Sequence, residues 1–584
     1  MRLIEAGDSA AAELAKHGYG EPLPLEVPQP EPLVQLWLAG VPVQWQPLAP
    51  KGLWPRQVLP TTPLDRIRCW VEEADSPEPD GLEGLQWQRR WTPLPPGESP
   101  AAGALWLLGG DAALQAQLAQ ALPLADLASL DQALASHGGP PPVLLVAPPS
   151  DQTELDLPFW QRWLPLLQGL ISRSPQLAAV HWLLRAPNTP AGEAWAALAR
   201  GWVRELGAQA GGLLWCGLQG EGLEELLRQE PAARRGVEWR VGAAGVVEAG
   251  VLAPYGPTAP AATPVFAPTA TTLISGGLGA LGLATAEALQ RWGARHLTLV
   301  ARRAPSPEQQ QRLAALEQLG IGISLEQLDV ADGAGVEALF ARLAAAGRPL
   351  AGIIHAAGVL DDGLLSHQSP ERCAAVAAAK VQGALHLDRC SRQLPHGFFV
   401  VYSSLAAALG SPGQVAYGAA NGWLDGLMLQ RQATGLPGLA INWGPWAGGG
   451  MAARHQGGLE PLQPAEALAL LQRWLPRQGR VALARLEPAA GGHPLAPRLQ
   501  QLAAELPALE ADQALAAVQT ALAELLAELG GFAAGELRGD TRLDALGLDS
   551  LMAVELATAV QAGLGVSLGL GALAGEPTLA SLAA

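Results

Sequence analysis

A glycine-rich turn between a short apolar run and a helical stretch limits the possible folds more than any other part of this sequence. Residues 271–274 are typical of a buried strand, and residues 283–292 have the periodicity of a helix. Between them, Gly277, Gly279 and Gly282 form a GxGxxG motif, whose glycines permit a tight turn and the close approach of a pyrophosphate to a helix N-terminus. The motif alone is a weak signal, but its place between a strand and a helix predicts a dinucleotide-binding βαβ unit.

The same alternation of short apolar runs and helical stretches fills two long regions of the chain. We expect a helix over 191–206 and buried parallel strands at residues 105–108, 143–146, 297–300, 352–355, 398–402 and 439–442. In the first region, Leu107-Leu108-Gly109-Gly110-Asp111 has too few glycines to hold a pyrophosphate closely. The sequence therefore predicts an α/β protein with two Rossmann-like, doubly wound parallel-sheet halves, of which the second binds the cofactor, followed by a small helical bundle.

The length of 584 residues is too great for one hydrophobic core and predicts several domains. Segments rich in proline, or without periodicity, separate the α/β regions from one another and from the C-terminal helical unit. We expect a linker over 1–82, a structural α/β half over 83–268, a catalytic α/β half over 269–488, a second linker over 489–512 and a helical unit over 513–584.

Four polar residues downstream of the turn form a candidate carbonyl-reducing site. Lys380, Ser404, Tyr417 and Asn421 follow one another at spacings of 24, 13 and 4 residues. The Tyr417 phenol can donate a proton to a substrate oxygen if a nearby ammonium lowers its pKa. Lys380 is the candidate, because only three of the 37 basic residues are lysines and an ammonium can relay protons where a guanidinium stays charged. The alternative is a chance lysine on a helix.

The residues that follow the next expected strands favour NADPH as the cofactor. Arg302 and Arg303 stand where an NAD enzyme would place an acidic residue, and two guanidiniums there suit a 2′-phosphate. The alternative is an exposed pair of arginines on a loop. Leu328-Asp329-Val330 could contact the adenine, and His355-Ala356-Ala357-Gly358 could line the ribose and nicotinamide. The expected cofactor contacts are Gly277, Leu278, Gly279, Gly282, Arg302, Arg303, Asp329, Val330, Ala356 and Ala357.

Charge and cysteine content exclude several other classes of protein. The formal net charge of −17 argues against a nucleic-acid or membrane-surface binder, because phosphates and anionic lipids would repel the chain. Four widely separated cysteines, and an N-terminus that carries Glu5 and Asp8 without an apolar core, favour a reduced cytoplasmic protein. His386, Cys390 and His396 are too loosely spaced to predict a metal site.

Taken in order, the motifs resemble the short-chain dehydrogenase/reductase family. Ordinary members carry Tyr-x-x-x-Lys on one helix face, whereas this chain has Tyr417-x-x-x-Asn421 and supplies Lys380 from upstream. That exchange is similar to the ketoreductase domains of modular polyketide synthases. The resemblance implies that Tyr417 is the proton donor and that Ser404 is a second hydrogen-bond donor to the carbonyl. It also implies that Lys380 lowers the pKa of Tyr417, that Asn421 organises Lys380, and that NADPH gives the hydride.

A short segment is similar to a stereocontrol element of those ketoreductases. Leu360-Asp361-Asp362 resembles the Leu-Asp-Asp signature of B-type enzymes, and Leu409 stands where A-type enzymes carry a tryptophan. The resemblance implies a (3R)-β-hydroxy product. Ala419 is not the proline of the epimerising subtype, which implies an α-carbon that is not epimerised. The alternative for residues 360–362 is a polar loop without a stereochemical role.

The C-terminal region has a charge and a motif of its own. Residues 505–584 contain 11 acidic residues and only two arginines, and Gly547-Leu548-Asp549-Ser550-Leu551 opens a helical run. A serine at a helix start is most often an N-cap. A small acidic helical unit with this motif nevertheless resembles an acyl carrier protein, whose Ser550 would receive 4′-phosphopantetheine. Residues 59–70 resemble the end of the linker that follows the acyltransferase of the same synthases.

The resemblance covers nearly the whole chain and implies a fragment of a modular polyketide synthase. Such a fragment would reduce a β-ketoacyl thioester on the carrier to a β-hydroxyacyl thioester. Its implied partners are a ketosynthase–acyltransferase region, a phosphopantetheinyl transferase, and a downstream module or thioesterase. Two alternatives stay open: a free-standing dehydrogenase of diffusible alcohols or ketones, and a carrier scaffold with a silent reductase.

Overall fold

The computed structural model describes most of the two α/β regions and parts of the C-terminal region. The described residues are 82–93, 104–149, 154–184, 188–206, 210–215, 238–241, 247–256, 266–395, 397–448, 459–486, 496–506, 509–530, 537–542, 556, 559–560, 564 and 578–583. All of them belong to one compact unit, Pro77–Ala584. Residues 1–81 of the linker expected over 1–82, most of the proline-rich segment before residue 266, and Ser550 lie outside the described residues.

The strands of the second α/β region form a doubly wound parallel sheet. They are β9 (Thr271–Ser275), β10 (His296–Ala301), β11 (Gly322–Gln327), β12 (Leu350–His355), β13 (Phe398–Ser404), β14 (Leu439–Trp443) and β15 (Gly479–Leu483). They run parallel in the order β11-β10-β9-β12-β13-β14-β15. The direction of winding reverses between β9 and β12, and ligands of such sheets bind beyond the carboxyl ends of the strands at that point.

The strands of the first α/β region repeat the arrangement. They are β2 (Leu105–Gly109), β3 (Leu122–Leu124), β4 (Val143–Ala147), β5 (Ala179–Leu184), β6 (Ala210–Trp215) and β7 (Glu238–Val241), which run parallel in the order β3-β2-β4-β5-β6-β7. The predicted strands in both regions are confirmed, because their apolar runs are buried on both faces of the sheet. The two doubly wound halves predicted from the sequence are therefore present.

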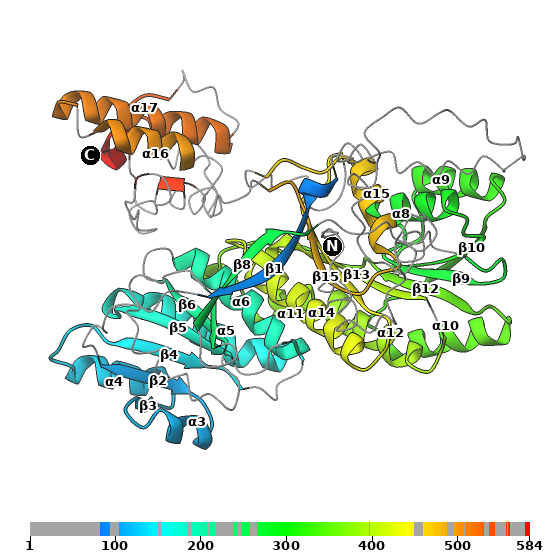
Figure 1. Ribbon diagram of the computed structural model, residues 1–584, viewed down its shortest axis with the longest axis horizontal. Coiled ribbons are helices and arrows are strands. Elements are labelled where there is room, and N and C mark those ends of the chain that lie inside the picture. Colours follow the sequence, from blue (N-terminus) through cyan, green and yellow to red (C-terminus); the bar gives the residue numbers. More distant parts are fainter. Residues whose placement is uncertain are drawn as a thin grey trace, which may run out of the picture. The chain divides into compact units, whose positions relative to one another are not determined.

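Two antiparallel strands join the halves into one sheet, which the sequence did not predict. β1 (Gln86–Pro93) pairs with β15 of the second half and with β8 (Val247–Pro254), and β8 pairs with β7 of the first half. Among the described residues, the result is a continuous sheet of 15 strands, with β1 and β8 running between the halves in Figure 1. The sheet of the catalytic half is thus extended by a strand from the N-terminal end of the range assigned to the structural half.

Helices cover both faces of the second half's sheet. In Figure 1, α8 (Ala280–Arg291), α9 (Pro307–Gln318) and α15 (Pro464–Trp474) lie on one face, and α10 (Gly333–Ala345), α12 (Gly383–Ser391) and α14 (Val415–Ala433) on the other. Two separate apolar clusters correspond to these faces. The remaining helices of this half are the 3₁₀ turn η7 (Leu365–His367), α11 (Pro370–Ala377), the π-helical η8 (Ala378–Gln382) and the short α13 (Leu405–Leu409).

Three of the four α-helices described in the first half are capped by acidic side chains. The four helices are α3 (Ala112–Gln117), α4 (Leu127–Ser136), α5 (Leu157–Arg173) and α6 (Pro190–Leu206), with short 3₁₀ turns η2 (Glu83–Leu85) and η3 (Ser174–Gln176). Asp111, Asp126 and Asp156 accept backbone N–H bonds at the starts of α3, α4 and α5, as N-caps do. The helix predicted over 191–206 is confirmed as α6.

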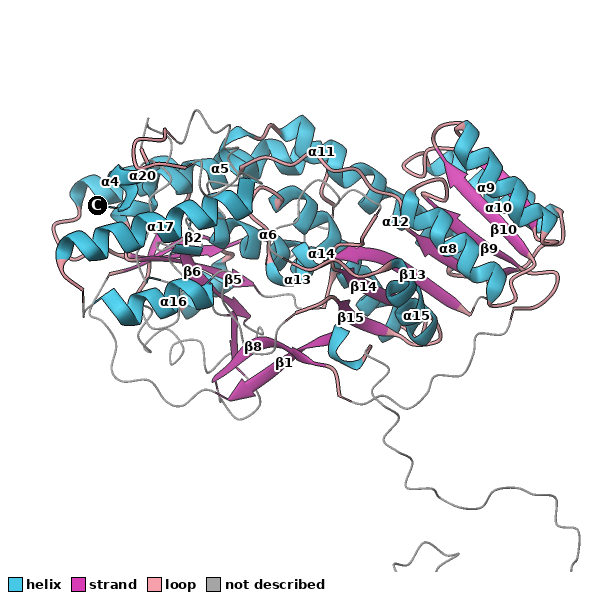
Figure 2. Ribbon diagram, turned by 90° about the horizontal axis from the view of Figure 1, so that it is seen from above, coloured by secondary structure: helices cyan, strands magenta, loops and turns pink. Residues whose placement is uncertain are grey.

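The closest approach of the two halves is between α6 and α14. A Cβ on Gly422 would lie 2.4 Å from the carbonyl oxygen of Glu193, and a Cβ on Gly426 would lie 2.3 Å from that of Thr189. Because these glycines lie one helical turn apart on α14, its backbone rests directly on the backbone of α6. Figure 2 shows α6 beside α13 and α14. The structural half therefore supports the helix that carries Tyr417.

The described part of the C-terminal region is helical. It contains α16 (Ala496–Glu505), α17 (Ala511–Gly530) and α20 (Leu579–Ala583), which share a small apolar core that includes Leu499, Leu526 and Leu579. α16 lies within residues 489–512, which were expected to be a linker. Part of that range is instead a helix, whose Leu499 packs into this core. No helix among the described residues combines the length and apolar character needed to cross a bilayer.

Candidate active site

The glycine-rich turn connects β9 to the start of α8, with Gly279 as the N-cap. Gly276 has a φ of 72°, and a Cβ there would lie 2.8 Å from the Ala356 carbonyl carbon. A Cβ on Gly282 would lie 2.3 Å from the Gly276 carbonyl oxygen, so Gly282 lies inside the first turn of α8, whereas the sequence placed it before the helix. Backbone atoms lie directly against Gly276 and Gly282, so the turn is compact at the helix start, as in pyrophosphate-binding turns.

The other expected cofactor residues lie at the same edge of the sheet. Ala356 and Ala357 follow β12 and contact the glycine-rich turn, while Leu278 within the turn is buried in the apolar core. Arg302 and Arg303 follow β10, and both are exposed. Since β9, β10 and β12 run parallel, these residues lie at the same carboxyl edge of the sheet, where a dinucleotide phosphate binds in such folds.

The two residues after β11 face different surroundings. Asp329 is exposed, and its side chain accepts a hydrogen bond from the N–H of Ala331 at 3.0 Å. Val330 is buried and belongs to the apolar core between the sheet and α12. A contact between this segment and an adenine would therefore involve Asp329 or the backbone more readily than the Val330 side chain.

Lys380 and Tyr417 come together from different helices. Lys380 lies in the π-helical η8, is 3% exposed, and its Nζ donates a hydrogen bond to the Tyr402 carbonyl oxygen at 2.9 Å. The Nζ lies 5.3 Å from the centroid of the Tyr417 ring. Burial lowers the pKa of Lys380 to about 7, although the nearby Asp425 carboxylate acts in the opposite direction. The ammonium thus lies beside the phenol and not in bulk solvent.

His355 fixes the backbone from which the Lys380 side chain extends. Its Nε2 lies 3.0 Å from the Lys380 carbonyl oxygen, and its Nδ1 lies 2.6 Å from the Ser275 hydroxyl. Because a carbonyl oxygen only accepts, Nε2 carries the proton, and Nδ1 accepts from Ser275. Burial and the Lys380 charge lower the pKa of His355 to about 3, so the ring stays neutral. The sequence proposed that His355 lines the ribose, but its fully buried ring holds Lys380 instead.

Tyr417 lies in the first turn of α14 and is half-buried. Burial raises its pKa, and hydrogen bonds with the side chains of Asn421 and Ser404 oppose that rise only in part. The sequence analysis expected Lys380 to lower the pKa of the phenol. The structure differs from this expectation, because loss of solvent around the Tyr417 hydroxyl outweighs the favourable contacts. The phenol is thereby kept in its protonated form, which is the form that donates.

Ser404 and its neighbour Ser403 have different surroundings. Ser404 ends β13 and caps α13, where its Oγ accepts the N–H of Ala406 at 3.2 Å. Ser403 is buried, donates to the Asn421 carbonyl oxygen at 3.2 Å, and accepts from Asn442 Nδ2 at 2.9 Å. Ser404 is therefore the serine that faces Tyr417, and Ser403 ties β13 to α14 and β14.

Asn421 contacts Tyr417 but not the Lys380 amine. Its Nδ2 donates to the Tyr417 carbonyl oxygen at 2.8 Å, and its Oδ1 is buried without a hydrogen-bond partner among the described residues. The Lys380 Nζ bonds to the Tyr402 carbonyl oxygen, as described above. The structure therefore shows no direct hydrogen bond between Asn421 and the Lys380 amine, and the organising role expected for Asn421 stays a prediction.

A buried pair that the sequence analysis did not single out lies beneath these residues. Asn442 Nδ2 donates to Asp425 Oδ2 at 2.8 Å, and burial raises the pKa of Asp425 to about 6. Asp425 stands one helical turn beyond Asn421 on the same face of α14. The sequence signal that could have identified Asp425 was an acidic residue four positions after Asn421, among mostly apolar residues.

The expected stereocontrol segment is tied to the turn before α14. The Asp361 carboxylate forms an ion pair with Arg372 of α11. Gln414 Nε2 donates to Asp362 Oδ2 at 3.0 Å, and the N–H of Gly363 donates to the Gly413 carbonyl oxygen at 2.9 Å. The segment therefore lies close to the start of the helix that carries Tyr417.

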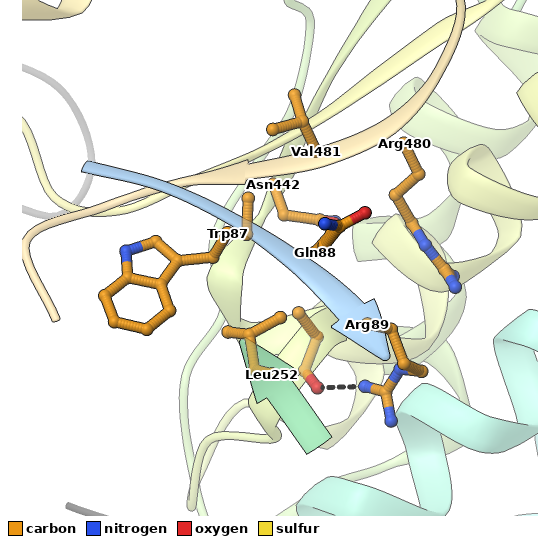
Figure 3. Close-up of a pocket in the computed structure, with 9 residues that line it drawn as sticks. Trp87, Gln88, Arg89, Leu252, Asn442, Arg480 and Val481 are labelled. Carbon is orange, nitrogen blue, oxygen red and sulfur yellow. Dashed lines mark hydrogen bonds between the residues drawn. The ribbon is translucent and has the colours of Figure 1, made fainter. Parts of the chain in front are cut away.

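A small pocket lies where the strands of the two halves join, and its lining does not include Tyr417, Ser404 or Lys380 (Figure 3). It is lined by Trp87, Gln88, Arg89, Leu252, Ala408, Asn442, Arg480, Val481 and Ala482. Arg89 donates to the Ala408 carbonyl oxygen at 2.7 Å, and Arg204 of α6 donates to that of Leu409 at 2.8 Å. The pocket thus belongs to the junction, and Arg89, which lines it, holds the end of α13, which Ser404 begins.

No metal-binding group of three or more His, Cys, Asp or Glu side chains occurs among the described residues. Within the same residues, Cys373 and Cys390 are free thiols. Of the three loosely spaced residues considered from the sequence, His396 lies outside the described residues.

Two protein families match parts of the chain. The family described as KR domain matches residues 270–448, and the family described as phosphopantetheine attachment site matches residues 520–584. The first match contains the glycine-rich turn, Lys380, Ser404, Tyr417 and Asn421. The second contains Ser550.

Curated relatives are polyketide synthases. Phenolphthiocerol synthesis polyketide synthase type I Pks15/1 of Mycobacterium marinum is 37% identical over 355 residues, which are 54% of this chain and 17% of that protein. Polyketide synthase GfsB of Streptomyces halstedii is 46% identical over 183 residues, which are 31% of this chain and 3% of that protein. This chain therefore spans a small part of the length of these relatives.

Solved structures with the same fold include ketoreductases. A-type ketoreductases from a modular polyketide synthase align with a TM-score of 0.61 at 27% identity, over 69% of this chain and 93% of theirs. An A1-type ketoreductase aligns with a TM-score of 0.62 at 25% identity, over 75% of this chain and 99% of its own. These shares exceed the length of the KR match, so the similarity extends beyond residues 270–448.

Proposed function

We propose that this chain, which carries the ketoreductase and phosphopantetheine-attachment domains of a modular polyketide synthase, reduces a carrier-bound β-ketoacyl thioester to a β-hydroxyacyl thioester with NADPH. The observation that carries the proposal is the Lys380 ammonium buried 5.3 Å from the Tyr417 ring, with Ser404 and Asn421 hydrogen-bonded to the same tyrosine. Tyr417 and Lys380 come from different helices. Burying an amine without an ion pair costs free energy, so its place beside the Tyr417 ring indicates a functional role.

The four residues have separate tasks in the proposed reaction. NADPH, when bound, supplies the hydride that the substrate's carbonyl carbon receives. The Tyr417 hydroxyl gives its proton to the carbonyl oxygen, and the Ser404 hydroxyl donates a second hydrogen bond to that oxygen. The Lys380 ammonium stabilises the phenolate that Tyr417 leaves behind, and Asn421 holds Tyr417 in place through its carbonyl.

The choice of NADPH over NADH rests on Arg302 and Arg303. Both side chains are exposed beyond the carboxyl end of β10, next to the glycine-rich turn. Their guanidiniums would hold the 2′-phosphate, while Gly277, Gly279 and Gly282 would receive the pyrophosphate at the start of α8. The (3R) configuration of the product rests on Leu360-Asp361-Asp362, whose position beside Gly413 and Gln414 places it near Tyr417.

Ser550 is the proposed attachment point of 4′-phosphopantetheine, and it lies within the matched attachment domain. We assign residues 1–82 to a post-acyltransferase linker, 83–268 and 269–488 to the structural and catalytic ketoreductase halves, 489–512 to a linker and 513–584 to the carrier. The proposed partners are a ketosynthase–acyltransferase region, a phosphopantetheinyl transferase, and a downstream module or thioesterase. We place the reaction in the cytoplasm, in keeping with the free thiols of Cys373 and Cys390.

The proposed function is tested by following NADPH oxidation with acetoacetyl pantetheine thioester as substrate. The full chain should oxidise NADPH only when the thioester is present. Tyr417→Phe removes the proton donor and should lower kcat by about 10²- to 10⁴-fold. NADPH affinity, read from its fluorescence, should stay within about twofold, because Tyr417 is not among the residues expected to hold the phosphates. A wild-type chain that binds NADPH but reduces no thioester would contradict the proposal.

A further inference from the structure

Glu205, in the half that lacks the glycine-rich turn, reaches across to two backbone segments of the catalytic half. It is the penultimate residue of α6, and its side chain is 7% exposed. Burying a carboxylate is costly unless hydrogen bonds compensate for the loss of water. The position of those hydrogen bonds therefore indicates what Glu205 does.

The two carboxylate oxygens of Glu205 bind two separate segments of the catalytic half. Oε2 accepts the N–H of Leu365 at 2.9 Å, and Oε1 accepts the N–H of Gly413 at 2.9 Å. Leu365 begins the turn η7, three residues after Asp362 at the end of the Leu360–Asp362 segment. Gly413 has a φ of 70° and precedes Tyr417 by four residues. One side chain thus connects the expected stereocontrol segment to the turn that begins the helix of Tyr417.

The same two segments also bind each other, so Glu205 completes a closed set of contacts. The N–H of Gly363 donates to the Gly413 carbonyl oxygen at 2.9 Å, and Gln414 donates to Asp362 at 3.0 Å. α6 is itself held against α14 by the close backbone contacts at Gly422 and Gly426. Glu205 therefore extends from a fixed support, and movement of either segment would break a bond to it.

The contact suits a carboxyl group better than an amide. Each oxygen of Glu205 faces one backbone N–H, and both can accept. A glutamine has a single carbonyl oxygen, so its amino group would face the second N–H. Burial raises the pKa of Glu205 to about 7, against which the bonds from Leu365 and Gly413 act. Those N–H groups are thus the groups that stabilise its charge.

We infer that Glu205 is a positioning residue that fixes the Leu360–Asp362 segment relative to Tyr417 and thereby sets the stereochemical fidelity of the reduction. The inference rests on the proposed function, because fidelity has a meaning only if a prochiral ketone is reduced. The face of the ketone that receives the hydride depends on how the substrate lies between this segment and the phenol. Loosening either segment would allow the opposite orientation.

The experiment compares Glu205→Gln and Glu205→Ala with the wild type in the full chain, using acetoacetyl pantetheine thioester and NADPH. Chiral analysis of the 3-hydroxybutyryl product should show one configuration for the wild type and a mixture for both variants. We expect kcat to fall by about 10- to 100-fold. NADPH affinity should change by less than about twofold, because Glu205 contacts neither the glycine-rich turn nor Arg302 and Arg303.

Glu193→Gln is the matched control. Glu193 is also buried on α6, but its carboxylate pairs with Arg480 of β15 and not with the two segments. The Glu193→Gln substitution should lower the midpoint of thermal unfolding without changing the configuration of the product. Equal mixtures from Glu193→Gln and Glu205→Gln would show that any weakening of α6 has the same effect, and would overturn a specific role for Glu205.

Amide hydrogen exchange gives a readout that does not depend on turnover. Peptides that contain Leu365 and Gly413 should exchange faster in Glu205→Gln than in the wild type, while peptides from β9 and α8 should not. Unchanged exchange together with an unchanged product configuration would overturn the inference. If the wild type reduces no thioester, the proposed function fails and the fidelity role fails with it, and faster exchange would then show that the contact alone is real.

Discussion

At the scale of single residues, the proposed site is governed by what burial does to ionisable groups. Lys380 is buried without a carboxylate ion pair among the described residues, and its pKa is lowered to about 7. The pKa of Tyr417 is raised by burial. Both shifts disfavour charge, so at neutral pH the phenol keeps its proton while the amine lies near its midpoint. The same burial that protects the proton donor therefore makes its neighbour sensitive to pH.

We predict that kcat/KM for thioester reduction falls as pH rises through about 7. The Lys380 ammonium is present below that pKa and is lost above it, and its loss removes the charge that stabilises the Tyr417 phenolate. Initial rates of NADPH oxidation between pH 6 and 9 measure the effect. The Lys380→Arg variant should be slower, but its kcat/KM should not fall as pH rises through about 7, because a guanidinium stays charged over the whole range. A wild-type profile that is flat over this range would contradict the role given to Lys380.

The exposed arginines after β10 give a second prediction for single side chains. Arg302→Ala combined with Arg303→Ala should raise KM for NADPH by about 10- to 100-fold, since charge-assisted hydrogen bonds to the 2′-phosphate are lost. KM for NADH, which lacks that phosphate, should change little. Arg295→Ala is the control, because Arg295 is equally exposed but precedes β10 at the opposite edge of the sheet. An unchanged ratio of NADPH to NADH use would refute the assignment.

At the scale of elements, the decisive contact is that between α6 and α14. α14 presents glycines to α6 at successive turns, and the resulting approach is close enough that a methyl group has no room. α13, which Ser404 begins, is held from the same side by Arg89 and Arg204. The elements that carry Tyr417 and Ser404 therefore take their positions from the half without a glycine-rich turn.

Gly422→Ala should destabilise the protein by about 1–3 kcal/mol, because the added Cβ would lie 2.4 Å from the Glu193 carbonyl oxygen and 2.6 Å from the Ala197 Cβ. Thermal and denaturant unfolding measure the loss. kcat should fall as well, since α14 can make room only by moving Tyr417. Gly138→Ala adds the same methyl group where no atom lies within 4 Å and should leave the midpoint within about 1 °C. Equal midpoints for both variants would argue against a tight α6–α14 contact.

At the scale of the whole molecule, the proposed function combines a two-half reductase with a carrier region on one polypeptide. The two halves share one sheet through β1 and β8, so they are not independent domains. A carrier on the same chain would deliver its acyl group at a high effective concentration, which removes the need for tight binding of a free substrate. Weak binding of small thioester mimics is the consequence for assays.

Incubation with a phosphopantetheinyl transferase and coenzyme A should add the mass of one phosphopantetheine to the wild-type chain and none to Ser550→Ala. Intact-mass spectrometry measures the difference. Ser550→Ala should keep its reduction of acetoacetyl pantetheine thioester, since the substitution lies outside the KR match. After loading with an acetoacetyl group, the wild type alone should reduce its own acyl chain when NADPH is added. Modification of Ser550→Ala to the same extent as the wild type would place the attachment elsewhere.

The sequence by itself determined the class of fold and most of the proposed site. Strand and helix positions follow from local periodicity, because a buried parallel strand must be apolar along its length. Lys380 stood out because lysine is rare in this chain, and the order of the motifs carried the resemblance to ketoreductases. These are properties of neighbouring residues or of composition, which a sequence displays directly.

Only the tertiary structure decided which distant residues complete the site. Gln86 pairs with Leu483, and Glu205 bonds to Leu365 and Gly413. These residues lie far apart in the sequence, and local periodicity does not predict contacts over such distances. The His355 ring is fully buried and bonds to the Lys380 carbonyl oxygen, so it is not exposed to a ribose. The sequence does not show how deeply this side chain is buried. The pKa of Tyr417 rises for the same reason. Burial and long-range contact are set by the packing of the whole chain, so they become known only with its three-dimensional structure.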